Sequence, residues 1–172
     1  AYKHFSTVLR KAGFNRYALI GGVATRIRAN PPTTTDIDIL VEGDDIALIA
    51  LLKKSGYAVM SADGIDEWWP EIFAFDKRWK IRVDIFISRR EFDDEVLYYA
   101  TPVRFNGSLF TVASVEHLIL YKLLAMRDKD AIHIQSLIDS HGGDINIGYI
   151  GKWARRLCVH DSFREYFKGD GE

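Results

Sequence analysis

The sequence predicts a mixed α/β (α+β) fold, in which a twisted sheet is flanked by helices and followed by a helical C-terminal part. Between residues 17 and 112, short apolar or alternating runs are interrupted by glycine, proline and helical segments. From Ser114 onward, apolar residues recur at helical spacing and no strand pattern returns. These patterns predict a core over residues 1–112 and a helical C-terminal subdomain over residues 113–172.

The composition is that of an ordinary globular protein. Of the 172 residues, 48% are hydrophobic and 27% are charged, which excludes the disordered and collagen-like classes. A single cysteine, Cys158, excludes an internal disulfide. We find no 18-residue apolar run and no signal-peptide pattern, so we expect a cytoplasmic protein without a membrane partner.

The net charge of −1 disfavours nucleic acid as an obligatory partner. Proteins that bind phosphate backbones usually carry a basic field that collects them. A local basic face would reverse this expectation. Its members would be Lys77, Arg78, Lys80, Arg89 and Arg90.

Punctuating residues divide the first two thirds of the chain into helices and strands. Gly13 and Gly56 end two helical patterns, and Asp44 or Asp45 is placed to cap the helix that ends at Gly56. Asn106-Gly107 is the favoured turn of a two-residue hairpin. The predicted helices cover residues 2–11, 23–29 and 44–54, and the predicted strands cover residues 17–20, 36–41, 57–62, 71–75, 80–87, 102–105 and 108–112.

The C-terminal part carries its own helix signals. Ser114 is a good N-cap, and Gly142-Gly143 ends the apolar pattern that follows it. A last short helix is predicted to begin at Ser162, where Glu165 would complete a capping box. The residues that this helix is expected to bury are Phe163, Tyr166 and Phe167.

The central motif is Asp36-Ile37-Asp38-Ile39, in which acidic and apolar residues alternate. Successive strand side chains point to opposite faces, so both carboxylates share one face. At about 4 Å their repulsion is ~1 kcal/mol in water and ~4 kcal/mol at an effective dielectric of 20, so a partly buried pair must hold a proton or bind a metal ion. Carboxylates suit Mg²⁺ or Mn²⁺. The motif alone favours a plainer alternative, a strand with a solvated acidic face.

Gly21-Gly22 follows the apolar strand over residues 17–20 and precedes a helix. Glycine lets the backbone approach a phosphate closely, and the free N–H groups of a helix N-terminus favour negative charge. This stretch is therefore a candidate anion site, with a tight turn as the commoner alternative. Arg26 either meets the same phosphate or is a solvated helix charge.

Asp84 and Lys122 are charged residues on predicted apolar surfaces. Asp84 lies mid-strand, where a lone carboxylate needs a partner or edge exposure, and a surface pair with Arg82 is the alternative. Lys122 follows Leu118 at i+4, so its amine needs a partner or must extend to solvent. We weigh a triphosphate partner equally with extension to solvent.

Taken together, Gly21-Gly22, the pair Asp36 and Asp38, and the later strand acid Asp84 resemble the signature of the DNA polymerase beta-like nucleotidyltransferase superfamily. Their order, spacing and strand contexts carry this resemblance, which covers residues 17–88. It suggests the branch of small bacterial nucleotidyltransferases that includes abortive-infection toxins. Gly22 stands where polymerases prefer serine, whereas the bacterial enzymes commonly have Gly-Gly.

The helical tail is also similar to that branch. Its members carry a lysine followed by an Arg-x-Lys-Asp run, and Lys122 and Arg127-Asp128-Lys129-Asp130 look similar. His133 departs from the branch, which often has a further aspartate there. The resemblance adds an antitoxin protein to the candidate partners.

The resemblance implies a nucleotidyltransferase core that moves NMP from an NTP to a hydroxyl and releases pyrophosphate, with two Mg²⁺ or Mn²⁺ ions. The implied catalytic and metal-ligating residues are Asp36, Asp38 and Asp84. The implied nucleotide-binding residues are Gly21, Gly22, Arg26, Thr35 and Lys122. Thr35 has turn-shaping as its alternative, and Trp68-Trp69 either stacks on a base or acceptor or packs in the fold.

The acceptor is left open among a small molecule, a protein and a tRNA end. A non-catalytic nucleotide-binding or regulatory protein on the same fold is the alternative function. The presence of all three acids favours the enzyme, because a degenerate relative is expected to have lost at least one.

Overall fold

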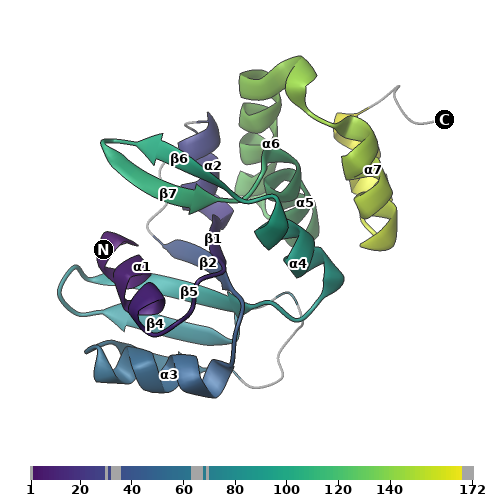
Figure 1. Ribbon diagram of the computed structural model, residues 1–172. Helices are drawn as coiled ribbons and strands as arrows, with labels where there is room; N and C mark the ends of the chain where they lie inside the picture. The colour runs from purple at the N-terminus through teal and green to yellow at the C-terminus, as the bar shows by residue number, and fades with distance from the viewer. Residues whose placement is uncertain (1, 30, 32–35, 63–67, 69, 168–172) are drawn as a thin grey trace.

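The computed structural model describes residues 2–29, 31, 36–62, 68 and 70–167. Its strands are β1 (Tyr17–Ile20), β2 (Ile37–Val41), β3 (Ala58–Ser61), β4 (Ile72–Asp76), β5 (Ile81–Ile87), β6 (Thr101–Phe105) and β7 (Ser108–Val112). Within these residues the strands form one sheet in the order β3-β4-β5-β2-β1-β7-β6 (Figure 1). The sheet is mixed, because β2 is parallel to β5 and antiparallel to β1.

The helices flank this sheet and make up the C-terminal part, as the sequence predicts. They are α1 (Tyr2–Lys11), α2 (Gly21–Ala29), α3 (Asp45–Lys54), α4 (Glu91–Tyr98), α5 (Val115–Ala125), α6 (Asp128–His141), the 3-10 turn η1 (Gly142–Asp144), α7 (Ile147–Arg156) and α8 (His160–Tyr166). α3 packs against β3 and β4, whereas α2 contacts α5 and α6. In Figure 1, α3 lies at one end of the molecule, and α5, α6 and α7 lie at the other.

Two predicted N-caps are confirmed by their hydrogen bonds. Asp44 Oδ1 accepts the Ala47 N–H over 2.7 Å and begins α3. Ser114 Oγ accepts the His117 N–H over 3.3 Å and begins α5. Each side chain satisfies a backbone donor that the first helical turn leaves without a partner.

Helix α4 has no counterpart in the sequence prediction. Its start is stabilised by Asp93, whose Oδ2 accepts the backbone N–H groups of Arg89 and Arg90, each over 3.1 Å. The N-cap position itself is Arg90, which is not one of the residues that signal a helix start. The capping side chain therefore belongs to the third residue of the helix, whereas the usual sequence signal for a helix start is a capping residue just before the helix.

Two predicted helix starts are wrong. Helix α2 begins at Gly21 rather than Val23, so the glycine pair belongs to its first turn. Helix α8 begins at His160 rather than Ser162, because the Phe163 N–H already bonds to the carbonyl of Val159 over 3.0 Å.

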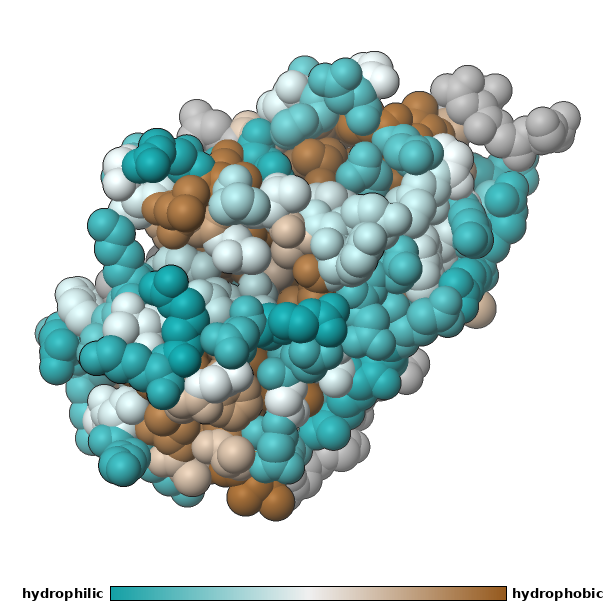
Figure 2. Space-filling model, viewed as in Figure 1, coloured by the Kyte–Doolittle hydropathy of each residue, from teal (hydrophilic) through white to brown (hydrophobic). Residues whose placement is uncertain are grey.

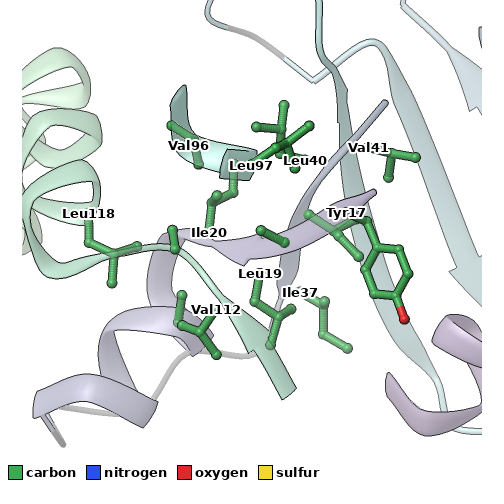
Figure 3. Close-up of a cluster of buried hydrophobic side chains, with 14 of the residues drawn as sticks. Tyr17, Leu19, Ile20, Ile37, Leu40, Val41, Val96, Leu97, Val112 and Leu118 are labelled. Atoms are coloured by element: carbon green, nitrogen blue, oxygen red, sulfur yellow. The ribbon is translucent and has the colours of Figure 1, made fainter. Parts of the chain in front are cut away.

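The sheet and the C-terminal helices share one hydrophobic core. Figure 3 shows side chains from β1, β2, β7, α4 and α5 in a single cluster. Leu19, Leu40, Val112 and Leu118 are each 0% exposed. Strand and helix side chains interleave here. The division of the chain into a core over residues 1–112 and a helical subdomain over residues 113–172 therefore stays a prediction.

The surface is mixed in character. On the face shown in Figure 2, hydrophilic residues cover most of the surface and hydrophobic residues gather in separate patches. Among the residues that the structure describes, no helix combines the length and the apolar character needed to cross a membrane.

Candidate active site

Two predicted site residues lie opposite each other on the central strands. In the parallel pair of β2 and β5, Asp38 lies directly opposite Asp84, so both carboxylates project from the same sheet face. Asp84 is buried and Asp38 is partly buried. Ile37 and Ile39 point to the other face and are buried in the core, which confirms the predicted alternation.

Burial makes these carboxylates harder to ionise. Burial first and the nearby charge of Asp84 second raise the pKa of Asp38 to about 6, against the opposing influence of the Gly22 N–H, Lys122 and Arg127. Burial also raises the pKa of Asp84, against the influence of Arg82. Both groups are therefore placed where a cation would favour their charged forms.

The glycine pair holds the Asp38 carboxylate against the start of α2. Gly21 has φ +64°, and a Cβ at this position would lie 2.0 Å from Asp38 Oδ2. The Gly22 N–H donates to the same oxygen over 3.3 Å. Only glycine allows this approach, because a side chain at Gly21 would occupy the place of the carboxylate. In this structure, the anion that lies against the glycine pair is therefore the carboxylate of Asp38.

The third acid, Asp36, lies just before β2 and shares a cation with Asp84. Arg82 Nη2 donates to Asp36 Oδ2 over 3.1 Å and to Asp84 Oδ2 over 2.9 Å. Arg82 Nε lies 2.8 Å from Asp84 Oδ1. The sequence prediction that the acids must hold a proton or a metal ion omitted this third solution, an internal guanidinium.

The donor set suits a hard divalent cation, but the carboxylates are not gathered around one point. Across residues 36–62, 68, 70–167 and the described N-terminal stretch, no three Asp, Glu, His or Cys side chains are arranged as a metal site. The donors themselves fit the chemistry of Mg²⁺ or Mn²⁺, because they are carboxylate oxygens. One of them, Asp84 Oδ1, is buried and accepts no hydrogen bond of normal geometry, so its lone pairs are available to a metal ion. Arg82 lies between the two acids that would have to meet.

Lys122 does not extend to solvent, and its predicted triphosphate partner stays a prediction. Its side chain is 2% exposed, and Nζ lies 3.0 Å from Asp130 Oδ1, so it forms a buried ion pair instead of extending to solvent. Arg127 Nε lies 2.8 Å from Asp130 Oδ2. Burial lowers the pKa of Lys122, and Asp130 opposes that effect. The partner is thus an aspartate of the Arg-Asp-Lys-Asp run.

His133 lies next to this ion pair. Its Nδ1 is 3.9 Å from Asp130 Oδ1, beyond hydrogen-bonding distance. Burial lowers the pKa of His133, and the charge of Lys122 lowers it further. The ring therefore favours its neutral form beside the buried charges.

Several of these side chains line one cavity of about 440 Å³, whereas Asp36, Asp130 and His133 are not part of its described lining. Its charged lining residues are Asp38, Asp84, Arg82, Lys122 and Arg127. Its aromatic lining residues, called the aromatic wall below, are Trp68, Phe73, Phe86 and Tyr121. Phe73 lies directly opposite Asp84 in the β4–β5 pair, which places the aromatic wall beside the acid.

The aromatic wall was missed by the sequence analysis apart from Trp68. Phe73 and Phe86 carry a usable signal, because strand alternation places Phe86 on the same face as Asp84. Trp68 packs edge-on against Phe92 and lies under the Arg90 guanidinium, which is 3.9 Å from the ring centroid. This tryptophan therefore both packs in the fold and faces the cavity.

Other candidates lie elsewhere. Arg26 is on α2 and is absent from the described lining of the cavity. Thr35 and Trp69 lie outside the described residues. In the predicted basic face, Arg89 pairs with Asp45 over 2.7 Å and Arg90 pairs with Asp93 over 2.9 Å. Nucleic-acid binding by this face stays a prediction.

No protein-family model matches the chain, and no curated protein matches it in sequence. Solved structures do match. The antibiotic-resistance factor ANT(2'')-Ia, in a solution structure, aligns with a TM-score of 0.64 at 14% identity, covering 96% of each chain. The chain has a nucleotidyltransferase fold. A crystal structure of ANT(2'')-Ia in complex with adenylyl-2''-tobramycin aligns with a TM-score of 0.60 at 16% identity, covering 95% of each chain.

A further nucleotidyltransferase-like structure is similar along most of its length. It is an antigenic protein from Paracoccidioides brasiliensis, with a TM-score of 0.57 and 18% identity over 94% of this chain and 89% of that one. At these identities the likeness establishes the nucleotidyltransferase fold. The chemistry of this chain has to be argued from its own side chains.

Proposed function

We propose that this protein is a metal-dependent nucleotidyltransferase that moves NMP from an NTP to a hydroxyl of an acceptor. The observation that carries the proposal is the pairing of Asp38 with Asp84 on adjacent parallel strands, at the start of α2 and inside a cavity lined by cations. Two carboxylates with raised pKa values and a neighbouring polycationic wall suit a metal-bound polyphosphate.

The proposed step is a displacement at the α-phosphorus. The acceptor oxygen forms a bond to phosphorus, the bond from phosphorus to the α–β bridging oxygen breaks, and pyrophosphate leaves with that electron pair. Asp84 takes the hydroxyl proton, for which its raised pKa makes it a stronger base than an exposed aspartate. Mg²⁺ or Mn²⁺, held by Asp36, Asp38 and Asp84, would neutralise charge on the attacking and leaving oxygens.

The cations of the cavity wall would hold the triphosphate. Lys122 and Arg127 face the cavity while Asp130 fixes both of them, so their positions are set before substrate arrives. Preorganised charges stabilise a developing anion without having to move during the reaction. Gly21 and Gly22 would contribute the positive end of α2 on the same side.

The acceptor would lie beside Asp84, against Phe73 and Phe86. Flat apolar side chains suit a ring-bearing molecule that presents one hydroxyl to the acid. Because ANT(2'')-Ia was solved with an adenylylated small molecule, small molecules are the first acceptors to test. Proteins, tRNA ends, the toxin-like branch and an antitoxin partner stay predictions for later tests.

The direct test is transfer of label. The protein is incubated with each α-labelled NTP, Mg²⁺ or Mn²⁺ and either tobramycin or a cell extract, and labelled products are identified. We expect at least one NTP to give a labelled product with the wild-type protein and none with Asp38→Asn. Tight NTP binding without any transfer would instead support the non-catalytic alternative.

A further inference from the structure

Arg82 lies where the proposed chemistry requires a different cation. It belongs to β5 and precedes Asp84 by two residues, so strand alternation sets both side chains on one face. Its guanidinium contacts Asp84 at 2.8 and 2.9 Å and Asp36 at 3.1 Å. One monovalent side chain thus joins an acid of β5 to an acid that lies just before the neighbouring strand β2.

This contact differs from those of the other cavity cations. Lys122 is 2% exposed and Asp130 holds it from the adjacent helix. Arg127 is tied to the same aspartate by Nε and Nη2. The Arg82 side chain is 51% exposed and Asp36 is 39% exposed, so water can replace the Arg82–Asp36 contact at little net expense. Asp84 is only 8% exposed, so its carboxylate needs another cation when Arg82 leaves. Arg127 is also exposed, at 56%, so Arg82 is set apart by its partners, which are two of the acids proposed to hold the metal ion.

We propose that Arg82 is a displaceable counter-ion, which neutralises Asp36 and Asp84 until a divalent cation enters with a nucleotide. Arg82 then turns to the triphosphate, so that it acts as a positioning residue for substrate. This inference rests on the proposed function, because it assigns the metal to the same acids. Its consequence is that free metal binds poorly and that nucleotide assists metal binding.

Competition and geometry explain this coupling. The guanidinium and a divalent cation need the same carboxylate oxygens, so one must leave before the other binds. A guanidinium presents a planar fork of donors that matches phosphate oxygens as well as it matches carboxylates. Arg82 lines the same cavity as Lys122 and Arg127, so a bound polyanion offers it a new partner within that cavity.

The test is a titration with Mn²⁺, followed by the electron paramagnetic resonance signal of the free ion. The full-length wild type is compared with Arg82→Gln, which removes the charge and keeps much of the side-chain length. Without nucleotide, we expect Arg82→Gln to bind Mn²⁺ more tightly by on the order of tenfold or more, since a contacting positive charge has been removed. The matched control is Arg127→Gln, which removes a cavity charge that contacts Asp130 instead, and it should change affinity less than about threefold, because its charge is already compensated.

A second arm adds a non-hydrolysable NTP analogue. We expect the analogue to tighten Mn²⁺ binding in the wild type and to do so less in Arg82→Gln, where no guanidinium has to be displaced. Without nucleotide, equal Mn²⁺ affinity in the wild type and Arg82→Gln would overturn the proposal. So would an Arg127→Gln variant whose Mn²⁺ affinity exceeds that of the wild type as much as the affinity of Arg82→Gln does. If Arg82→Gln does not fold by far-UV circular dichroism, Arg82→Met replaces it, because it also removes the charge, and the same gain in Mn²⁺ affinity is expected.

Failure of the proposed function is measured separately, as absence of label transfer from every NTP. A wild-type protein that transfers label while Arg82→Gln shows no gain in Mn²⁺ affinity would refute only the role of Arg82. Tighter Mn²⁺ binding by Arg82→Gln supports the counter-ion role whether or not transfer is detected.

Discussion

Two ion-pair clusters line the same cavity and are built in opposite ways. Between α5 and α6, Lys122 and Asp130 are 2% and 1% exposed, and the pair is enclosed by protein. Between β2 and β5, Arg82 bridges Asp36 and Asp84 with half of its side chain in solvent. A buried pair is costly to break, because the remaining charge cannot be hydrated, whereas an exposed pair is exchanged for water. The first cluster is suited to fix geometry and the second to change partners.

The largest expected effect separates the clusters by stability. Asp130→Asn leaves Lys122 without its anionic partner in a buried position, so we expect the free energy of unfolding to fall by about 3–5 kcal/mol. Urea denaturation at pH 7 measures this change. The control is Glu42→Gln, which breaks the exposed pair with Arg16 and should cost less than about 1 kcal/mol. Similar losses in both variants would mean that burial does not distinguish the two kinds of pair.

The next prediction concerns the pH dependence of Asp38. Its pKa in the folded protein is about 6, above the ordinary value, so the folded state binds more protons than the unfolded state between about pH 4 and 6. Stability contributed by this group is therefore lost as pH rises through that window. We expect Asp38→Asn to gain about 1–3 kcal/mol over the wild type between pH 4 and pH 7, measured by urea denaturation.

The same titration should appear in ligand binding. A metal ion needs the ionised carboxylate, so Mn²⁺ affinity in the presence of an NTP analogue should fall by about tenfold per pH unit below pH 6. A flat profile from pH 5 to 7 would contradict the assignment of Asp38 as a ligand.

A smaller stability effect, with a large effect on the site, is expected from Gly21→Ala. The added Cβ would meet Asp38 Oδ2 at 2.0 Å, and φ of +64° is strained for alanine, so we expect about 2 kcal/mol of destabilisation and loss of Mn²⁺-dependent NTP binding. Gly13→Ala is the matched control. It has φ +89° with nothing within 4 Å, so it should show the backbone strain of about 1 kcal/mol and keep full binding. Normal NTP binding by Gly21→Ala would show that the glycine pair is only a tight turn and has no role in NTP binding.

The comparison also explains what the sequence could predict. The alternation of Asp36 to Val41 depends on local geometry, so it gave the strand, which begins one residue later at Ile37, and it correctly placed Asp38 on the face opposite Ile37 and Ile39. The position of Asp84 opposite Asp38 depends on the pairing of β2 with β5, which are separated by about forty residues of chain and two strands. No local pattern contains that register, and only the resemblance to a known superfamily brought the two acids together.

The contacts of the cations were harder to predict, for a related reason. Helix α5 ends just before Met126, whose φ of 44° is left-handed. Helix α6 then packs back against α5, and this brings Asp130 to Lys122. Methionine is not a residue that signals this conformation. Arg82 was correctly placed beside Asp84, but its contact with Asp36 joins β5 to the residue just before the neighbouring strand β2, and it follows from the fold.

The smallest predicted effect tests whether the acids of the strand cluster repel each other in the metal-free protein. Without Arg82, Asp36→Asn would be expected to stabilise the protein by removing a like charge near Asp84. Because Arg82 already joins both acids and its pair with Asp36 is exposed, we expect Asp36→Asn to change the free energy of unfolding by less than about 1 kcal/mol. Arg82→Gln also leaves the buried Asp84 without its cation, so it should cost more than Asp36→Asn.

A variant that combines Asp36→Asn with Arg82→Gln gives the coupling energy between the two side chains. If the Asp36–Arg82 contact is formed in solution, the effects of Asp36→Asn and Arg82→Gln should be non-additive by about 0.2–1 kcal/mol, and added salt should reduce that coupling. Urea denaturation of the four proteins at low and high salt gives the value. Strict additivity at low salt would show that the guanidinium is not held by Asp36. The exchange of Arg82 for a metal ion would then begin from Asp84 alone, where the buried carboxylate provides two of its three contacts.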